Sequence, residues 1–106
     1  MIRHCVLIRF KPEVTTAERA QHYQAIQALR EHLPGWLDFV CGDNVTLEPG
    51  MDKGFNGGFS IDFADAAARD AYLNDPAHQR AGAGLVAAAV EGIDGIVVFD
   101  WNPSGF

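Results

Sequence analysis

Two strand-like segments in the middle of the chain are joined by a connection too short to hold a crossover helix. Residues 36–47 carry apolar side chains on both faces, and residues 55–63 alternate between a mainly aromatic face and a small, polar one. A period of two is typical of a half-buried strand. Because parallel neighbours need a crossover of about a dozen residues or more, residues 48–54 predict an antiparallel pair. The Gly-Asp-Asn stretch at 42–44 predicts a bulge or bend in the first strand.

A helix is predicted before this pair of strands. Thr15 and Glu18 match the capping-box pattern, in which each side chain binds the backbone N–H of the other residue. Apolar residues at helical spacing, with Tyr23 among them, extend this pattern from about 16 to 33. Pro34 has no N–H to continue a helix, so the helix is predicted to end before it.

Two further strands are predicted near the ends of the chain, at residues 2–11 and 93–101. In the first strand the even-numbered residues form an apolar face that His4 interrupts. Cys5 and Leu7 form the apolar centre of the opposite face, which has a charged rim. An apolar centre inside a charged rim indicates a surface where a second subunit packs.

The predicted order of elements is β-α-β-β-α-(α)-β. This order is typical of the ferredoxin-like fold, an α+β class with an antiparallel sheet and helices on one face. By length the chain is a single domain, residues 1–106. The bare face of so small a sheet needs a cover, and a second copy of the same sheet supplies one. We therefore predict a homodimer formed through the open sheet face.

The composition limits the partners of the chain. Its formal net charge of −6 disfavours nucleic acid and an anionic membrane surface, both of which attract basic proteins. No apolar run approaches the ~20 residues needed to span a bilayer. Cys5 and Cys41 lie in different predicted strands without metal-ligand spacing, so we expect free thiols and a cytoplasmic location. The four histidines show no metal-binding spacing either, and no metal site is predicted.

A chemically suggestive pattern lies where two short helices meet. A helix capped by Asp65 is predicted to run to residue 73, and a second helix is predicted from Pro76 to about 90. Asp75 is a favourable N-cap for the second helix, which places His78 in its first turn. There the helix dipole disfavours an imidazolium, whereas the Asp75 carboxylate favours it. A neutral histidine suits general-base chemistry, and the phenol of Tyr72 can donate a hydrogen bond.

His4 is informative because it interrupts an apolar strand face. A buried imidazole needs a hydrogen-bond partner, since an unsatisfied buried polar group costs about 1–3 kcal/mol. A satisfied core histidine and a pocket wall both explain this residue, and the sequence leaves the choice open. The face of the sheet that carries His4 is the one expected to meet the helices. His4 and His78 therefore satisfy the geometric condition for sharing a pocket.

Four motifs make the chain resemble a known family: His4 to Lys11, Gly54 to Phe63, Tyr72 to His78, and Val98 to Trp101. They are similar to the stress-responsive A/B barrel (Dabb) domains of the dimeric α+β barrel superfamily, over nearly the whole length of the chain. The resemblance implies a ferredoxin-like subunit whose dimer forms an α+β barrel.

The resemblance also implies site residues. The family includes a plant polyketide cyclase that closes its product by intramolecular aldol condensation, using a histidine and a tyrosine. Matching the motifs implies that His78 and Tyr72 form the catalytic pair and that His4 belongs to the pocket. The chain departs from that enzyme at Asp75, where a histidine is expected, and at Phe55, where a tyrosine is commoner.

These implications define a leading functional hypothesis. It is a pocket between sheet and helices that binds a small apolar or carbonyl-containing ligand, with acid/base chemistry next to a carbonyl of the polyketide-cyclase aldol or lyase type. The predicted substrate-binding residues are His4, Tyr23 and Phe59, and no cofactor is implied. Two alternatives stay open: a non-enzymatic stress-responsive or small-ligand-binding protein, and a cofactor-free or haem-using monooxygenase-like enzyme.

Overall fold

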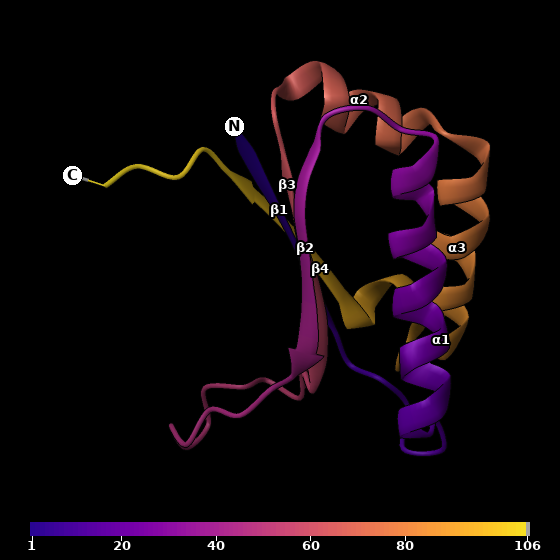
Figure 1. The fold of residues 1–106 in the computed structure, drawn as a ribbon. Coiled ribbons are helices and arrows are strands. Elements are labelled where there is room, and N and C mark those ends of the chain that lie inside the picture. The colour runs from indigo at the N-terminus through magenta and orange to yellow at the C-terminus, as the bar shows by residue number, and fades with distance from the viewer. Residues whose placement is uncertain (106) are drawn as a thin grey trace.

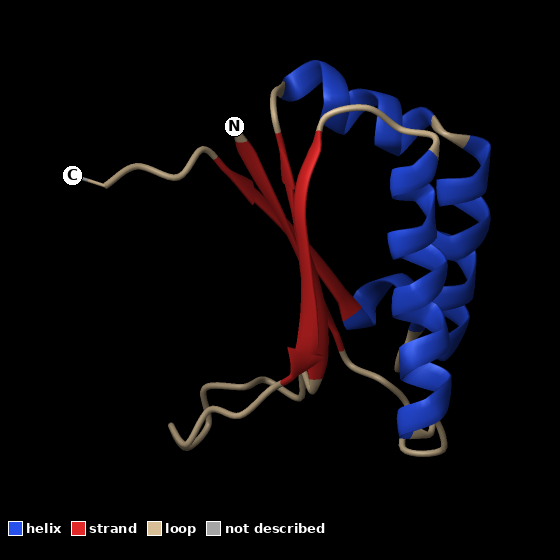
Figure 2. Ribbon diagram, viewed as in Figure 1, coloured by secondary structure: helices blue, strands red, loops and turns tan. Residues whose placement is uncertain are grey.

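The computed structural model describes residues 1–105, which form a four-stranded antiparallel sheet with helices on one face (Figure 1). Figure 2 shows the two layers, with all helices on the same side of the strands. The elements are β1 (Ile2–Ile8), α1 (Thr16–Gln27), the 3₁₀ helix η1 (Ala28–Glu31), β2 (Trp36–Asp43), β3 (Gly57–Phe63), α2 (Ala66–Asn74), α3 (Pro76–Ala88), the 3₁₀ helix η2 (Gly92–Gly95) and β4 (Ile96–Trp101). This order confirms the predicted ferredoxin-like α+β fold.

β1 lies in the middle of the sheet, whose strand order is β2-β3-β1-β4. It pairs antiparallel with β3 and β4, and β2 pairs antiparallel with β3, as the short connection predicted. The register places Ile61 and Asp100 on either side of His4. Because directly opposed residues point to the same face of a sheet, Asp100 shares the helix-covered face with His4.

Several element ends differ from the sequence-based prediction. β1 and α3 end earlier than predicted and β4 begins later, because the chain after α3 returns to the end of β1. There the N–H of Arg9 donates to the carbonyl of Gly95, and the N–H of Val90 donates to the carbonyl of Arg9, both at 2.8 Å. The 3₁₀ helix η2 begins at Gly92, just beyond the predicted end of the second short helix. The first predicted helix is α-helical only to Gln27, after which η1 tightens the last turn.

A bulge or bend is predicted at 42–44, but the register is regular from Asp38 to Asp43 and the bulge lies at the start of β2, between Trp36 and Asp38. The extra residue there, Leu37, is 55% exposed, whereas Trp36 is turned into the core and is 7% exposed. β2 also stops before Asn44, short of the predicted residue 47. The Asn44 side chain bonds the backbone on both sides of the following loop, which draws the chain out of the ladder.

The helix-covered face of the sheet forms the hydrophobic core. Its largest fully buried side chains are Tyr72, Phe10, Phe63, Ile8, Ile26 and Ile61. Burying a side chain of this size contributes roughly 1.5–3 kcal/mol to stability. His4 lies in the same layer and is only 3% exposed.

The opposite face of the sheet has no helix over it (Figure 1). Large apolar side chains stand exposed on this open face: Leu7 from β1, Val40 from β2, and Val97, Phe99 and Trp101 from β4. The β2–β3 loop and the C-terminal tail both extend on this side of the sheet (Figure 1). A contiguous exposed apolar patch of this kind is typical of a protein–protein interface.

Two glycines should respond in opposite ways to alanine. A Cβ at Gly82, inside α3, would meet no heavy atom within 4 Å, so we expect Gly82→Ala to raise the free energy of unfolding by about 0.5–1 kcal/mol. A Cβ at Gly95 would clash with the backbone carbonyl of Val90, so Gly95→Ala should lower it by roughly 1–3 kcal/mol. Urea denaturation of both variants tests this. Destabilisation by the Gly82 change would mean that the space beside α3 is filled.

Candidate functional site

His4, Tyr72 and His78 come together on the inner side of the sheet. They are held by three elements, β1, α2 and α3 respectively. The ring centroid of Tyr72 lies 4.0 Å from that of His78 and 5.5 Å from that of His4. Tyr72 is therefore placed between the two imidazoles, and residues far apart in the sequence form one cluster.

The break between α2 and α3 has the local structure that the sequence predicted. Asp75 is the C-cap of α2 and the N-cap of α3, with Pro76 at the first helical position. One Asp75 oxygen accepts a hydrogen bond from the backbone N–H of His78 at 3.1 Å, and the other lies 3.0 Å from Nε2 of His32. The carboxylate thus fixes the backbone of His78 without touching its ring nitrogens.

Three buried polar atoms around Tyr72 have no hydrogen-bond partner within residues 1–105. They are Oη of Tyr72, Nδ1 of His78 and Nε1 of Trp36. Tyr72 is fully buried, and burial raises the pKa of its phenol well above the ordinary value, so the hydroxyl stays protonated. Unsatisfied buried polar atoms are rare in folded proteins, and each needs an explanation, such as a bound water, an ion, strain or a catalytic role.

Burial has the largest influence on His78 and lowers the pKa of its imidazole below the ordinary 6.5. The backbone carbonyl of Leu73 and the Asp75 carboxylate act in the opposite direction, while His4 adds to the lowering. From the sequence it was open whether the helix dipole would lower the pKa of His78 or Asp75 would raise it. Desolvation has the largest effect, and the pKa is lowered. The imidazole is neutral at neutral pH, the form that can accept a proton.

The lowered pKa of His78 predicts a loss of stability in acid. The unfolded chain protonates this residue near pH 6.5, whereas the folded chain does so only at lower pH. Stability therefore falls as the pH drops below about 6.5, because the unfolded state binds the proton first. In urea denaturation between about pH 8 and pH 5, we expect the wild type to lose more stability than His78→Gln. Equal losses would contradict the lowered pKa.

His4 has a partner that sequence reasoning missed. Its Nδ1 lies 2.7 Å from Oδ1 of Asp100, and the other oxygen of Asp100 accepts a hydrogen bond from Arg69 at 3.3 Å. Because Nδ1 is bonded to Asp100, Nε2 is the ring nitrogen of His4 that is available to other partners. The sequence offered one signal for this partner, a carboxylate at an even-numbered position of the last predicted strand. Without the β1–β4 register, Asp100 could not be assigned to His4.

Tyr23 and Phe59, the other predicted substrate-binding residues, lie together elsewhere in the core. Their ring centroids are 6.2 Å apart, and they contact Phe10 and Phe39 rather than His78. Burial raises the pKa of Tyr23 to about 12. The structure therefore brings together three of the five predicted site residues and places the other two in a neighbouring aromatic group.

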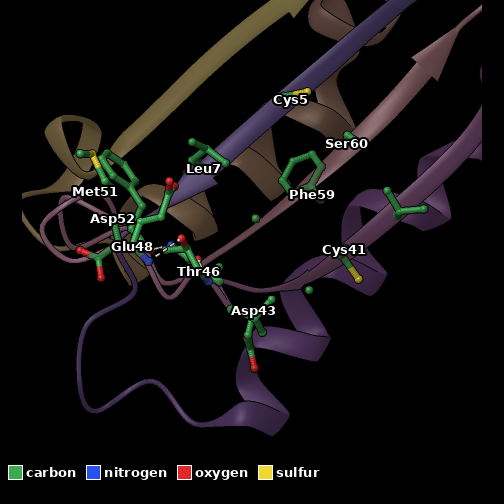
Figure 3. A pocket seen from close by; sticks show the side chains of 17 residues that line it. Cys5, Leu7, Cys41, Asp43, Thr46, Glu48, Met51, Asp52, Phe59 and Ser60 are labelled. Atoms are coloured by element: carbon green, nitrogen blue, oxygen red, sulfur yellow. Dashed lines mark hydrogen bonds between the residues drawn. The ribbon is translucent and has the colours of Figure 1, made fainter.

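A concavity of about 590 Å³ lies on the open side of the sheet, under the β2–β3 loop (Figure 3). Leu7 from β1 and Met51 from the loop contribute to its apolar wall. It is on the face opposite the sheet–helix interface where the sequence predicted a pocket. The expected pocket beside His78 thus stays a prediction.

Within residues 1–105, no group of three or more histidine, cysteine, aspartate or glutamate side chains is arranged to hold a metal ion. Cys5 and Cys41 are free thiols. None of the helices in the described part of the chain is both long and apolar enough to cross a bilayer.

The model of the stress responsive A/B barrel domain family matches residues 2–103. The chain belongs to the stress-responsive A/B barrel (Dabb) family. Among its relatives, olivetolic acid cyclase from Cannabis sativa is 24% identical over 102 residues, which is 96% of each chain. The family resemblance seen in the sequence motifs is therefore confirmed.

Solved structures of similar proteins agree with the fold of this Dabb chain. A dimeric ferredoxin-like protein of unknown function from Jannaschia sp. CCS1 is 34% identical, with 96% of this chain and 98% of that chain covered and a TM-score of 0.86. Hydroxynitrile lyase from Passiflora edulis is 19% identical, with 99% and 95% covered and a TM-score of 0.79. The second likeness supports the fold alone.

Proposed function

We propose that this Dabb protein is an acid/base enzyme that acts on a carbon next to a carbonyl group, in a reaction of the aldol or lyase type. The observation that carries the proposal is the contact between the buried Tyr72 and the half-buried His78, whose Oη and Nδ1 atoms are buried and have no partner within residues 1–105. A phenol kept protonated and an imidazole kept neutral are the acid and base that such chemistry needs. The cyclase named among the relatives supports this choice.

Each residue has a defined role in the proposed step. His78 accepts a proton from the carbon, the C–H electron pair forms the C=C bond of an enolate, and the carbonyl electron pair moves to oxygen. Tyr72 donates a hydrogen bond to this oxygen as its negative charge develops. His4, held by Asp100, forms the opposite wall and orients the substrate. Return of the proton to the carbon completes the exchange reaction. In an aldol reaction the enolate carbon instead attacks a second carbonyl, whose electron pair moves to its oxygen, and His78 gives its proton to that alkoxide.

We also propose that the protein is a homodimer in which two open sheet faces pack together. The exposed apolar side chains of β1, β2 and β4 lie on that face, and the Jannaschia relative is dimeric. The helix side, which carries His78, stays clear of this interface. Each subunit then holds its own site.

The test is deuterium exchange at the carbon next to the carbonyl of acetophenone and of 2-octanone in D₂O, followed by NMR. Exchange reports enolisation, the step shared by aldol reactions. We expect Tyr72→Phe to slow exchange by about 10²-fold, because it removes the donor to the developing oxyanion. Its stability should be unchanged or higher, since the lost hydroxyl has no partner within the described residues.

The outcomes separate the candidate functions. Exchange by the wild type that is unaffected by Tyr72→Phe would overturn the assigned role of the phenol. Ketone binding without exchange would instead favour the small-ligand-binding alternative. The absence of both exchange and binding would count against acid/base chemistry on simple ketones.

A further inference from the structure

We propose that the indole N–H of Trp36 is a second hydrogen-bond donor at the Tyr72–His78 site and binds an acceptor oxygen of the ligand. This rests on the proposed function, because the ligand oxygen is the partner that the indole lacks. No sequence motif singled out Trp36, and its role follows from the way β2 begins.

The bulge at the start of β2 turns Trp36 inward. The extra residue, Leu37, lies on the surface, so the indole rather than its neighbour enters the core opposite Phe63. The Trp36 ring meets the Tyr72 ring edge-on, with centroids 5.6 Å apart and an interplanar angle of 71°. Tyr72 is thus in contact with Trp36, His4 and His78 at once.

The surroundings of the indole leave its N–H unsatisfied. Apart from Tyr72, the rings in contact with it are Phe39, at 6.3 Å, and Phe63, at 5.6 Å, and neither has a hydrogen-bond acceptor. Nε1 has no partner within residues 1–105, although Trp36 is 93% buried. Burying an unpaired donor costs about 1–3 kcal/mol, a cost that an aromatic side chain without an N–H would not incur at this position.

The chemistry of the donor defines the kind of ligand. An indole N–H donates and cannot accept, so it selects an oxygen or nitrogen with a free lone pair. The Tyr72 hydroxyl in the same cluster remains protonated and can also donate. Two neutral donors beside a neutral base favour a neutral carbonyl compound over a cation. The same donors strengthen their bonds when negative charge develops on the carbonyl oxygen.

The experiment combines kinetics with the NMR signal of the indole. In the chain of 106 residues, Trp36→Phe should lower kcat for deuterium exchange of acetophenone about tenfold, with little change in KM. Phe39→Leu is the matched control, because Phe39 stacks on Trp36 without offering a donor, and it should change kcat by less than about twofold. In ¹⁵N-tryptophan-labelled protein, acetophenone should shift the Trp36 indole signal and leave that of the exposed Trp101 in place.

The exchange rate and the indole NMR signal together separate the donor role of Trp36 from the proposed reaction. A shifted Trp36 signal without exchange would support the donor role while the proposed reaction fails. Exchange that is equally fast in Trp36→Phe, with an unmoved indole signal, would overturn the donor role and leave the proposed reaction standing. Equal losses in Trp36→Phe and Phe39→Leu would show that Trp36 serves packing alone. The absence of both signal shift and exchange with acetophenone and 2-octanone would overturn both.

Discussion

Replacing His78 by glutamine should slow deuterium exchange of the ketone by roughly 10²–10⁴-fold, the range expected for loss of a positioned general base. Glutamine keeps a polar side chain of similar length and preserves the backbone N–H that binds Asp75. It has no group that can accept the proton at neutral pH. The effect should therefore appear in kcat, and the two hydrogen-bond donors, Tyr72 and Trp36, should account for the remaining rate.

His32→Gln provides the matched control for this prediction. His32 also meets Asp75, at 3.0 Å, but its side chain is half exposed and its ring makes no contact with Tyr72 among the described aromatic pairs. Its exchange rate should stay within about twofold of the wild type. If His32→Gln lost as much activity as His78→Gln, the effect would come from the Asp75 cap and the shape of the helix break rather than from general-base chemistry.

Placing a charge on the open sheet face should dissociate the proposed dimer. Phe99 is 55% exposed and packs against Trp101, with ring centroids 5.3 Å apart, in the apolar patch of β4. Phe99→Asp would bury an unpaired carboxylate between two sheets, at a cost of several kcal/mol. Since about 1.4 kcal/mol changes an equilibrium tenfold, the dimer dissociation constant should rise by roughly 10²–10³-fold or more.

Light scattering at micromolar concentration measures this change directly. The wild type should have twice the chain mass of 11.5 kDa, and Phe99→Asp should approach the mass of one chain. Ile93→Asp is the control, because Ile93 is 75% exposed in η2, outside the open sheet face, and this variant should remain dimeric. A monomeric wild type, or a dimeric Phe99→Asp, would exclude the open face as the interface.

The site and the proposed interface use opposite faces of one sheet. In β1, His4 points to the helices, while Cys5 and Leu7, at the odd-numbered positions, point to the open face. The alternation of a strand thus separates ligand chemistry from association with a partner. Variants of Phe99 and of His78 should consequently act independently, on mass and on exchange rate respectively.

Local features of the molecule could be predicted well from the sequence. The helix starts are set by side chains that bind backbone N–H groups only a few residues away: Thr15, Asp65 and Asp75 all act as predicted. The faces of β1 and β3 follow from strict alternation, which is a property of the strand itself. These signals were sufficient for the ferredoxin-like order of elements and for placing His4 and His78 on one side of the sheet.

Other features depend on the register between strands and on chain segments that return to β1, so they became clear only from the tertiary structure. The partner of His4 is Asp100, 96 residues later, and only the β1–β4 register brings the two together. The early end of α3 follows from backbone hydrogen bonds to Arg9, which no local sequence pattern predicts. The bulge that turns Trp36 inward likewise depends on how β2 meets β3. The order of the elements and the faces of the strands could be predicted from the sequence, because they depend on interactions between residues close together in the chain. The completed cluster around Tyr72 needed the fold, because its members meet only when distant segments pack.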